Sequence, residues 1–291
     1  MTDIEITWKC NQNCINCIFD TEKMYKDKDI KIEEIYKLID NLDENKDYLG
    51  ISGGEPTLRK ELIDILKYIK KNKPNLLTMM VTNGTMLAYR KYVKAIKNAA
   101  PENFYIAIAI YGHKKEIHEA HTRSQNSFYY TLLGIKNSIL EGLWTEVRYM
   151  ITKLNYKYLT NFAWFVIDEF PEVNRVVMLN IKYTGNALKY KDVLFIKESE
   201  AVPYVIKAVD ILLGNGFKEP PNNHEIRLYH FPLCLLPEKY WKFSEGVTKF
   251  DDDVIFIEKC NKCKVKEMCP KIWKSYIELA GDSEFIPINE E

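Results

Sequence analysis

The sequence lacks an excess of charge of either sign. Its 291 residues include 41 lysines and arginines and 41 aspartates and glutamates. A face that binds nucleic acid or an anionic membrane nonspecifically needs a surplus of positive charge. Nucleic acid is therefore disfavoured as a partner, and 46% apolar with 28% charged residues is the balance of an ordinary soluble protein.

Long hydrophobic runs are absent as well. No apolar stretch in the chain approaches the roughly 18 residues that a membrane-spanning helix needs. The first strand-like stretch, residues 4–8, begins almost at Met1, and no secretion signal precedes it. We therefore expect a cytoplasmic protein with no membrane partner.

The cysteines lack the pattern of a disulfide framework. There are seven of them, an odd number, and six fall into two tight groups. In a chain without a secretion signal, such an arrangement indicates metal binding or redox chemistry. None of the five histidines lies at ligand spacing from a cysteine, so we expect surface or structural roles for them.

Strand-like and helix-like periods alternate along the first two thirds of the chain. Strands are predicted at residues 5–8, 48–52, 76–82, 104–111, 145–152 and 173–182, and helices at 31–42, 58–70, 89–99, 128–141, 158–169 and 202–213. Repeated strand–helix units imply parallel strands with helical crossovers. Six units of about 30 residues each leave too little chain for a closed eight-unit barrel. The predicted fold class is α/β: a partial (β/α)6 TIM-type barrel over residues 1–199, followed by a small cysteine-rich extension over residues 200–291.

Four short motifs follow the first four predicted strands. They are Cys10, Cys14 and Cys17 after the first strand, Gly53-Gly54-Glu55-Pro56 after the second, Thr82-Asn83-Gly84-Thr85 after the third and Tyr111-Gly112-His113 after the fourth. Loops at the carboxyl ends of the strands build the active site of a parallel barrel. We therefore expect the four motifs to gather at one mouth.

The loop after the first strand carries three thiols and no fourth. An iron–sulfur cube with four irons and four sulfurs (4Fe-4S) normally takes four protein ligands. Cys10, Cys14 and Cys17 can hold three irons of such a cube and leave the fourth iron open to a small molecule. Taken alone, the same three cysteines fit half of a zinc site equally well.

The Cys-x3-Cys-x2-Cys loop after the first strand, together with the Gly-Gly-Glu-Pro turn after the second, resembles the radical S-adenosylmethionine (radical SAM) superfamily over roughly residues 3 to 185. The resemblance implies a 4Fe-4S cluster on the three cysteines, with S-adenosylmethionine (SAM) chelating its open iron. It also implies an electron donor such as flavodoxin or ferredoxin.

Further site residues follow from the same resemblance. Gly53, Gly54 and Glu55 match the turn that meets the methionine amino group of SAM, and Asn83 lies where family members contact cofactor or substrate. Arg123 and Arg148 are candidates to pair with the methionine carboxylate, because a guanidinium suits bidentate recognition; each also fits an ordinary structural role. Asn16 departs from the family pattern, which commonly has an aromatic residue before the third cysteine.

The last ninety or so residues carry the other four cysteines: Cys234, Cys260, Cys263 and Cys269. Four thiols can close an iron–sulfur cluster or a tetrahedral zinc site, although Cys234 also fits a buried free cysteine. The Cys-x2-Cys-x5-Cys pattern resembles the twitch or SPASM-like auxiliary-cluster extensions of radical SAM enzymes. Residues 232–237 with Trp241 are similar to the tail of the His-Xaa-Ser system radical SAM maturases. We expect a second 4Fe-4S cluster here, with zinc as the alternative.

The resemblance implies an enzyme that reductively cleaves SAM to a 5'-deoxyadenosyl radical, which abstracts hydrogen from a substrate. No protein side chain need act as a catalytic residue, since the SAM-derived radical performs the chemistry. We expect a peptide that undergoes post-translational modification as the substrate. The alternatives are a small metabolite or an RNA base as substrate, or a noncatalytic iron–sulfur partner of another radical enzyme.

Overall fold

A parallel sheet of eight strands lies at the centre of the computed structural model, which describes residues 2–24, 29–246 and 251–289. The strands are β1 (Thr2–Thr7), β2 (Tyr48–Gly53), β3 (Leu77–Thr82), β4 (Phe104–Ala109), β5 (Trp144–Ile151), β6 (Arg175–Asn180), β7 (Glu225–Tyr229) and β8 (Ser244–Glu245). Each strand pairs with the next one along the chain. All their carboxyl ends therefore meet at one edge of the sheet.

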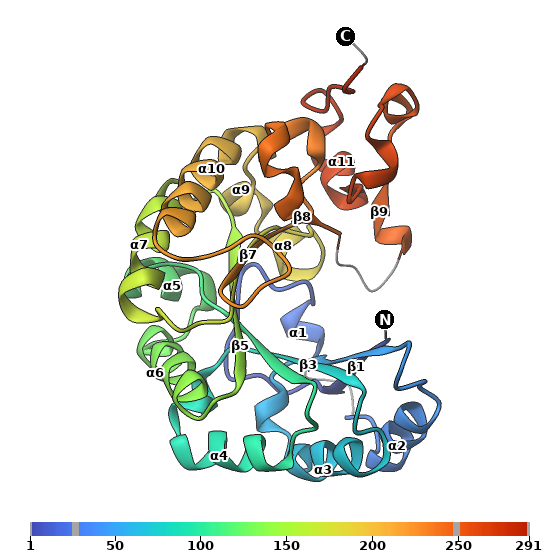
Figure 1. Cartoon of the computed structure of the whole chain (residues 1–291), viewed down its shortest axis with the longest axis vertical. Helices are drawn as coiled ribbons and strands as arrows, with labels where there is room; N and C mark the ends of the chain where they lie inside the picture. The colour runs from blue at the N-terminus through green and yellow to red at the C-terminus, as the bar shows by residue number, and fades with distance from the viewer. Residues whose placement is uncertain (1, 25–28, 247–250, 290–291) are drawn as a thin grey trace.

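The longer helices connect these strands and lie in an arc around the outside of the sheet (Figure 1). They are α2 (Ile32–Asp40), α3 (Leu62–Asn72), α4 (Arg90–Ala99), α6 (Ser127–Leu140), α7 (Leu159–Glu169) and α10 (Glu198–Gly214). Shorter helices are α1 (Thr21–Met24), α5 (Lys115–Thr122), α8 (Gly185–Lys189), α9 (Lys191–Leu194) and α11 (Lys274–Ala280). This arrangement confirms the predicted α/β fold with an open, TIM-type half-barrel.

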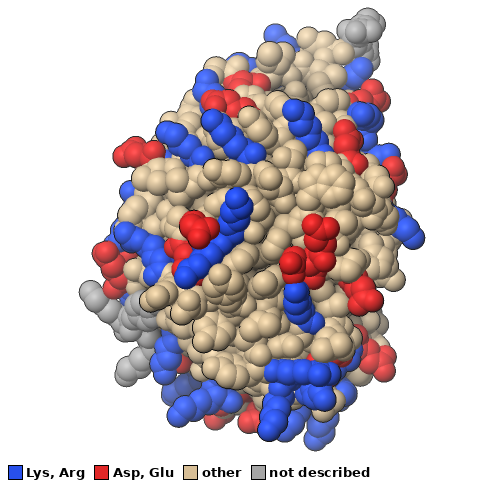
Figure 2. Space-filling view, turned by 90° about the vertical axis from the view of Figure 1, so that its left-hand side faces the viewer, with Lys and Arg blue, Asp and Glu red and all other residues tan. Residues whose placement is uncertain are grey.

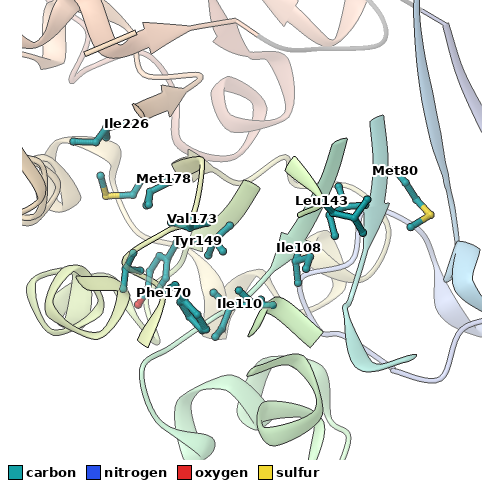
Figure 3. Packing of buried hydrophobic residues seen from close by; sticks show 14 of the residues in the cluster. Met80, Ile108, Ile110, Leu143, Tyr149, Phe170, Val173, Met178 and Ile226 are labelled. Carbon is teal, nitrogen blue, oxygen red and sulfur yellow. The ribbon is translucent and has the colours of Figure 1, made fainter. Parts of the chain in front are cut away.

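Successive side chains of each strand face opposite sides of the sheet: one side packs against the helices and forms the core, and the other faces the inside of the barrel, the lumen. Ile108, Tyr149 and Met178 point toward the helices and are fully buried in the main hydrophobic cluster (Figure 3). Each such side chain stabilises the fold by about 1.5–3 kcal/mol relative to an exposed one. The intervening residues, such as Glu146 and Arg148, face the opposite side of the sheet because successive side chains of a strand alternate.

The sheet continues beyond the six predicted strands. β7 pairs with β6, and β8 pairs with β7, while α10 packs against α7. Residues 198–245 therefore extend the half-barrel across the predicted boundary at residue 200, and the division into two functional units stays a prediction. Glu225 and Arg227 make β7 too polar to stand out as a buried strand in the sequence, and β8 has only two residues.

After β8 the described chain continues in short elements. β9 (Val254–Ile255) and β10 (Ile272–Trp273) form an antiparallel pair, and several 3-10 turns and α11 complete this end of the molecule (Figure 1). A second hydrophobic cluster holds it against the barrel. Ile15 from the loop after β1 belongs to that cluster together with Trp273, Tyr276 and Phe285.

The surface carries both signs of charge. On the face in Figure 2, basic and acidic side chains occur together among uncharged ones, as the even charge balance of the sequence implies. None of the helices within the described residues combines the length and apolar character that a bilayer crossing requires.

Candidate functional site

Three thiols lie on the loop that follows β1, at the carboxyl edge of the sheet. Cys10, Cys14 and Cys17 are partly buried and form no disulfide. Burial raises the pKa of the Cys10 thiol to about 12. Burial also raises the pKa of Cys14 well above its usual range, and the nearby thiolates of Cys17 and Cys10 add to that effect. The three thiols thus lie near one another, and burial together with mutual repulsion favours their neutral forms unless a cation binds them.

The end of α5 fixes the middle of this loop. The backbone amides of Asn13 and Ile15 donate to the carbonyl oxygens of Thr122 (3.1 Å) and His121 (2.8 Å). The His121 ring hydrogen bonds Thr152 at 2.8 Å, and burial lowers its pKa to about 4. His121 therefore has the structural role expected of the histidines, although its link to the cysteine loop was not predicted.

A second anchor comes from the opposite side, at α8. The Ala187 amide donates to the Cys17 carbonyl at 3.0 Å, and the Asn186 side chain donates to the Cys14 carbonyl at 2.9 Å. Asn186 is itself buried. Sequence patterns gave no sign of this contact, because it joins residues about 170 positions apart.

The glycine turn after β2 closes the base of the loop. The Gly54 and Glu55 amides donate to the carbonyl oxygens of Thr7 and Lys9, both at 2.7 Å. A Cβ at Gly53 would lie 2.2 Å from the Thr7 oxygen, and one at Gly54 would lie 2.3 Å from the Lys9 oxygen. The close approach that these glycines permit is thus between two loops of the protein; their predicted contact with SAM stays a prediction.

Glu55 links the turn after β2 to the turn after β3. Its carboxylate is buried and accepts hydrogen bonds from Thr82 Oγ1 (2.6 Å) and the amides of Asn83 (2.7 Å) and Thr57 (3.1 Å). Burial raises its pKa. Among the described residues, Oε2 accepts only the Asn83 amide, and a carboxylate oxygen can accept two hydrogen bonds. This oxygen therefore fits the predicted acceptor of an amino group.

Asn83 joins the loop after β3 to the cysteine loop. Its side-chain nitrogen Nδ2 donates to Asn11 Oδ1 at 2.7 Å, and its side-chain oxygen Oδ1 accepts from the Thr85 backbone amide at 3.0 Å. Asn11 returns a hydrogen bond to the Thr85 hydroxyl at 2.8 Å. Asn83 thus lies at the predicted mouth, next to the residue that follows Cys10.

The two predicted arginines have different surroundings. Arg123 adopts a left-handed backbone (φ 52°) at the end of α5, and its guanidinium donates to the Tyr190 hydroxyl at 2.6 Å. Arg148 lies on the lumen side of β5 in an ion pair with the fully buried Glu146. Within the part of the chain that the structure describes they share no partner, and pairing of either one with the methionine carboxylate stays a prediction.

The four remaining cysteines come together at the other end of the molecule. Cys234, Cys260, Cys263 and Cys269 line one cavity whose walls are otherwise largely apolar. Burial raises the pKa of Cys234 to about 12, with the thiolates of Cys269, Cys260 and Cys263 adding to the shift. Among the described residues, no three or more histidine, cysteine or acidic side chains are arranged as ligands of a single ion.

The chemistry of both donor sets fits an iron–sulfur cluster. Each consists of thiols, the ligands that iron–sulfur cubes take, and the first set has three where a closed site has four. The role of all seven cysteines as ligands, and the resemblance of the tail to twitch or SPASM-like extensions, stay predictions.

Comparison with known proteins defines the class. A sequence profile described as the Radical SAM superfamily matches residues 4–163, so the chain belongs to the radical SAM superfamily, whose members use a 4Fe-4S cluster and SAM. Fe-coproporphyrin III synthase of Methanosarcina barkeri is 25% identical over 215 residues, which are 73% of this chain and 52% of that protein. GTP 3',8-cyclase of Limosilactobacillus fermentum is 30% identical over 270 residues, which are 84% of this chain and 74% of that protein.

Solved structures share the fold at low sequence identity. Streptococcus suis SuiB bound to the precursor peptide SuiA superposes with a TM-score of 0.60 at 15% identity over 78% of this chain and 48% of that chain. Native anSMEcpe with bound AdoMet and a peptide gives 0.57 at 18% identity over 77% and 62%. The chain thus spans only about half the length of several proteins that it resembles.

Proposed function

We propose that this radical SAM enzyme modifies a peptide, using a 4Fe-4S cluster bound by Cys10, Cys14 and Cys17. The observation that carries the proposal is the three-thiol loop, which backbone hydrogen bonds fix from α5, from α8 and from the glycine turn. When bound, the cluster and SAM supply an electron and a 5'-deoxyadenosyl radical that abstracts hydrogen from the substrate. An electron donor such as flavodoxin or ferredoxin belongs to the proposal, as does the predicted cytoplasmic location.

The chain's own residues bind and orient the reactants. The three thiolates would hold three irons of the cluster, on a loop that backbone hydrogen bonds fix. Oε2 of Glu55 would accept a hydrogen bond from the methionine amino group, beside Asn83, which joins the loop after β3 to the cysteine loop.

We also propose that Cys234, Cys260, Cys263 and Cys269 close a second 4Fe-4S cluster. Their shared cavity supports this, since four thiolates suffice to fill every iron corner. Zinc is the alternative occupant. Anaerobic reconstitution separates the two: about eight irons per chain agree with two cubes, whereas about four irons with one zinc agree with a structural zinc tail.

A small metabolite is the second candidate substrate. The sequence relatives support it, since they are named for GTP and coproporphyrin, whereas the structural neighbours that hold peptides support the first candidate. The test is an anaerobic reaction with dithionite and SAM on candidate peptides from neighbouring genes. A mass change on a peptide, coupled to 5'-deoxyadenosine, agrees with the peptide proposal; coupling only to small molecules would contradict it.

A further inference from the structure

The lumen of the half-barrel holds a cavity of about 680 Å³, within the range of small-molecule sites. Tyr48, Trp144 and Arg175 line it and are the first residues of β2, β5 and β6. Tyr229 and Glu245, the last residues of β7 and β8, line it as well, so the cavity extends from the amino ends of the first strands to the carboxyl ends of the last two. Arg148 is the one residue of this lining that was also a candidate to pair with the methionine carboxylate of SAM; here it is assigned to a different ligand instead.

A row of alternating charges crosses the wall of this cavity. It runs through Arg148 and Glu146 on β5, Arg175 on β6, Glu225 and Arg227 on β7 and Glu245 on β8. Arg175 Nη1 lies 2.8 Å from Glu146, and Arg227 Nε lies 3.1 Å from Glu225. Glu146 and Glu225 are buried, whereas all three arginines line the cavity. The acids thus lie beneath the guanidinium groups and hold them toward the lumen.

Aromatic rings fix the planes of two of these arginines. The Arg175 guanidinium carbon lies 4.6 Å from the ring centre of Trp144 and 5.8 Å from that of Tyr105. The Arg148 guanidinium carbon lies 5.6 Å from the ring centre of Tyr229. Stacked, ion-paired guanidinium groups lose little further freedom when a ligand binds, which favours binding.

Hydrogen-bond donors outnumber acceptors along this wall. Both oxygens of Glu146 are taken, one by Arg148 and one by Arg175, and both oxygens of Glu225 also accept hydrogen bonds. Arg148 donates through Nε and Nη2, and Arg175 through Nε and Nη1. Within the described ranges, Arg148 Nη1 and Arg175 Nη2 make no hydrogen bond.

Two acidic residues also line the cavity. Glu245 is paired with Arg227, and Glu102 lies in the exposed turn before β4. Negative charge is therefore present at the rim, while the surplus of donors lies around Arg148 and Arg175.

The cavity wall approaches the cysteine loop along β5. Met150, the next residue of β5 on the lumen side after Arg148, contacts the Asn16 side chain at 3.1 Å. Asn16 immediately precedes Cys17. A ligand held at Arg148 would therefore extend toward the cysteine loop with one lumen-facing residue of β5 between them.

We propose that Arg148 and Arg175 bind an anionic group of the substrate, a carboxylate or a phosphate, in the barrel lumen. The inference rests on the proposed function only in treating this ligand as the substrate. In a peptide the group is an acidic side chain or the terminal carboxylate; in a small metabolite it is a carboxylate or a phosphate.

The test measures binding of three probes to the full chain with its cluster and SAM in place, by ligand-observed NMR titration. The probes are N-acetylglutamate amide, N-acetylphosphoserine amide and the neutral N-acetylglutamine amide. We expect at least one anionic probe to bind roughly tenfold more tightly than the neutral probe, because hydrogen bonds to charged groups are the stronger ones. The tighter of the two anionic probes identifies a carboxylate or a phosphate as the group.

Two conservative variants locate the site. Arg148→Lys and Arg175→Lys keep a positive charge beside Glu146 but remove the planar fork of donors, so we expect each to weaken the preferred anionic probe roughly tenfold and leave the neutral probe unchanged. Arg90→Lys is the matched control, since Arg90 is exposed on α4 and pairs with Glu141. If one lumen variant does not fold, the other still tests the site.

Three outcomes would overturn the inference: equal binding of charged and neutral probes, no binding of any probe at about 20 mM, or unchanged affinity in a folded lumen variant. A 5'-deoxyadenosine assay on the same samples tests the proposed function separately. Production of deoxyadenosine without an anion preference would contradict this inference alone, whereas an anion preference without deoxyadenosine would contradict the proposed function alone.

Discussion

The two cysteine-bearing regions are built in different ways. The loop after β1 is fixed by distant parts of the chain, through backbone hydrogen bonds with the end of α5, with α8 and with the glycine turn. In the tail, the amides of two cysteines bond to residues only three positions earlier in the chain. The Cys263 amide donates to the Cys260 carbonyl at 3.0 Å, and the Cys269 amide donates to the Lys266 carbonyl at 3.1 Å. The barrel thus forms the first site in advance, whereas the tail depends more on whatever its thiols bind.

Removing a single thiol from each region gives the largest expected difference. Cys14→Ala takes one of three ligands from the open cluster, so we expect 5'-deoxyadenosine formation to fall to background. Cys263→Ala removes a tail thiol and should leave deoxyadenosine formation intact or only partly reduced. An anaerobic assay with dithionite measures both. Equal loss in the two variants would show that the regions do not divide the work in this way.

The next largest effect, on stability and iron content, is expected when the loop after β1 is displaced without removing a thiol. Gly54→Ala places a Cβ 2.3 Å from the Lys9 oxygen, so the turn and the loop must separate. We expect a loss of about 2–4 kcal/mol in unfolding free energy, together with lower iron content. Gly214→Ala is the control, because a Cβ there meets no atom within 4 Å. Denaturant unfolding and iron analysis measure both, and an iron content unchanged in Gly54→Ala would show that the loop does not need this contact.

Metal removal should affect the tail before the barrel. We expect chelation to abolish amide hydrogen-exchange protection over residues 251–289 while protection in β3 to β6 persists, since metal binding and local folding are coupled. Hydrogen-exchange mass spectrometry of metal-loaded and chelated protein compares the regions directly. Simultaneous loss in both would mean that the barrel is equally dependent on its cluster.

Acid gives a smaller difference that is specific to the barrel. Burial lowers the pKa of His121 to about 4, from an unfolded value of 6.5, so the unfolded chain binds more protons between these pH values. The stability that neutral His121 contributes is present above pH 6.5 and is lost as pH falls toward 4. His121→Gln should reduce the slope of this part of the stability–pH curve, and His118, whose pKa burial lowers to about 3, should supply the slope that is left. His113→Gln, on a half-exposed ring, should change the slope little. Urea midpoints from pH 4 to 7 measure the slope.

The sequence predicted what short-range patterns encode. The first six strands and their principal helices appear close to their predicted ranges, because apolar residues at helical spacing such as Ile65, Leu66 and Ile69 are buried on one face. The order of the motifs along successive parallel strands was enough to predict one mouth at the carboxyl edge.

Short-range sequence patterns could not predict contacts between residues that are far apart in the chain. Asn186 binds the cysteine loop from about 170 residues away, and the ion pairs of Arg175 with Glu146 and with Glu225 depend on strand register. Arg148 was selected for its ability to bind a carboxylate, but the side of the sheet on which it lies, and therefore its neighbours, follow only from the folded structure. The polar strand β7 was missed for the same reason: its charges are paired across strands.

The central claim concerns the open iron of the cluster on the loop after β1, and electron–nuclear double resonance tests it most directly. The sample is the Cys263→Ala variant, reduced and loaded with SAM that carries nitrogen-15 in its amino group. The account predicts hyperfine coupling between that nitrogen and the cluster, and loss of the signal when Cys14 is also replaced. A reduced cluster without such coupling, or one with all four irons bound by protein atoms, would contradict it.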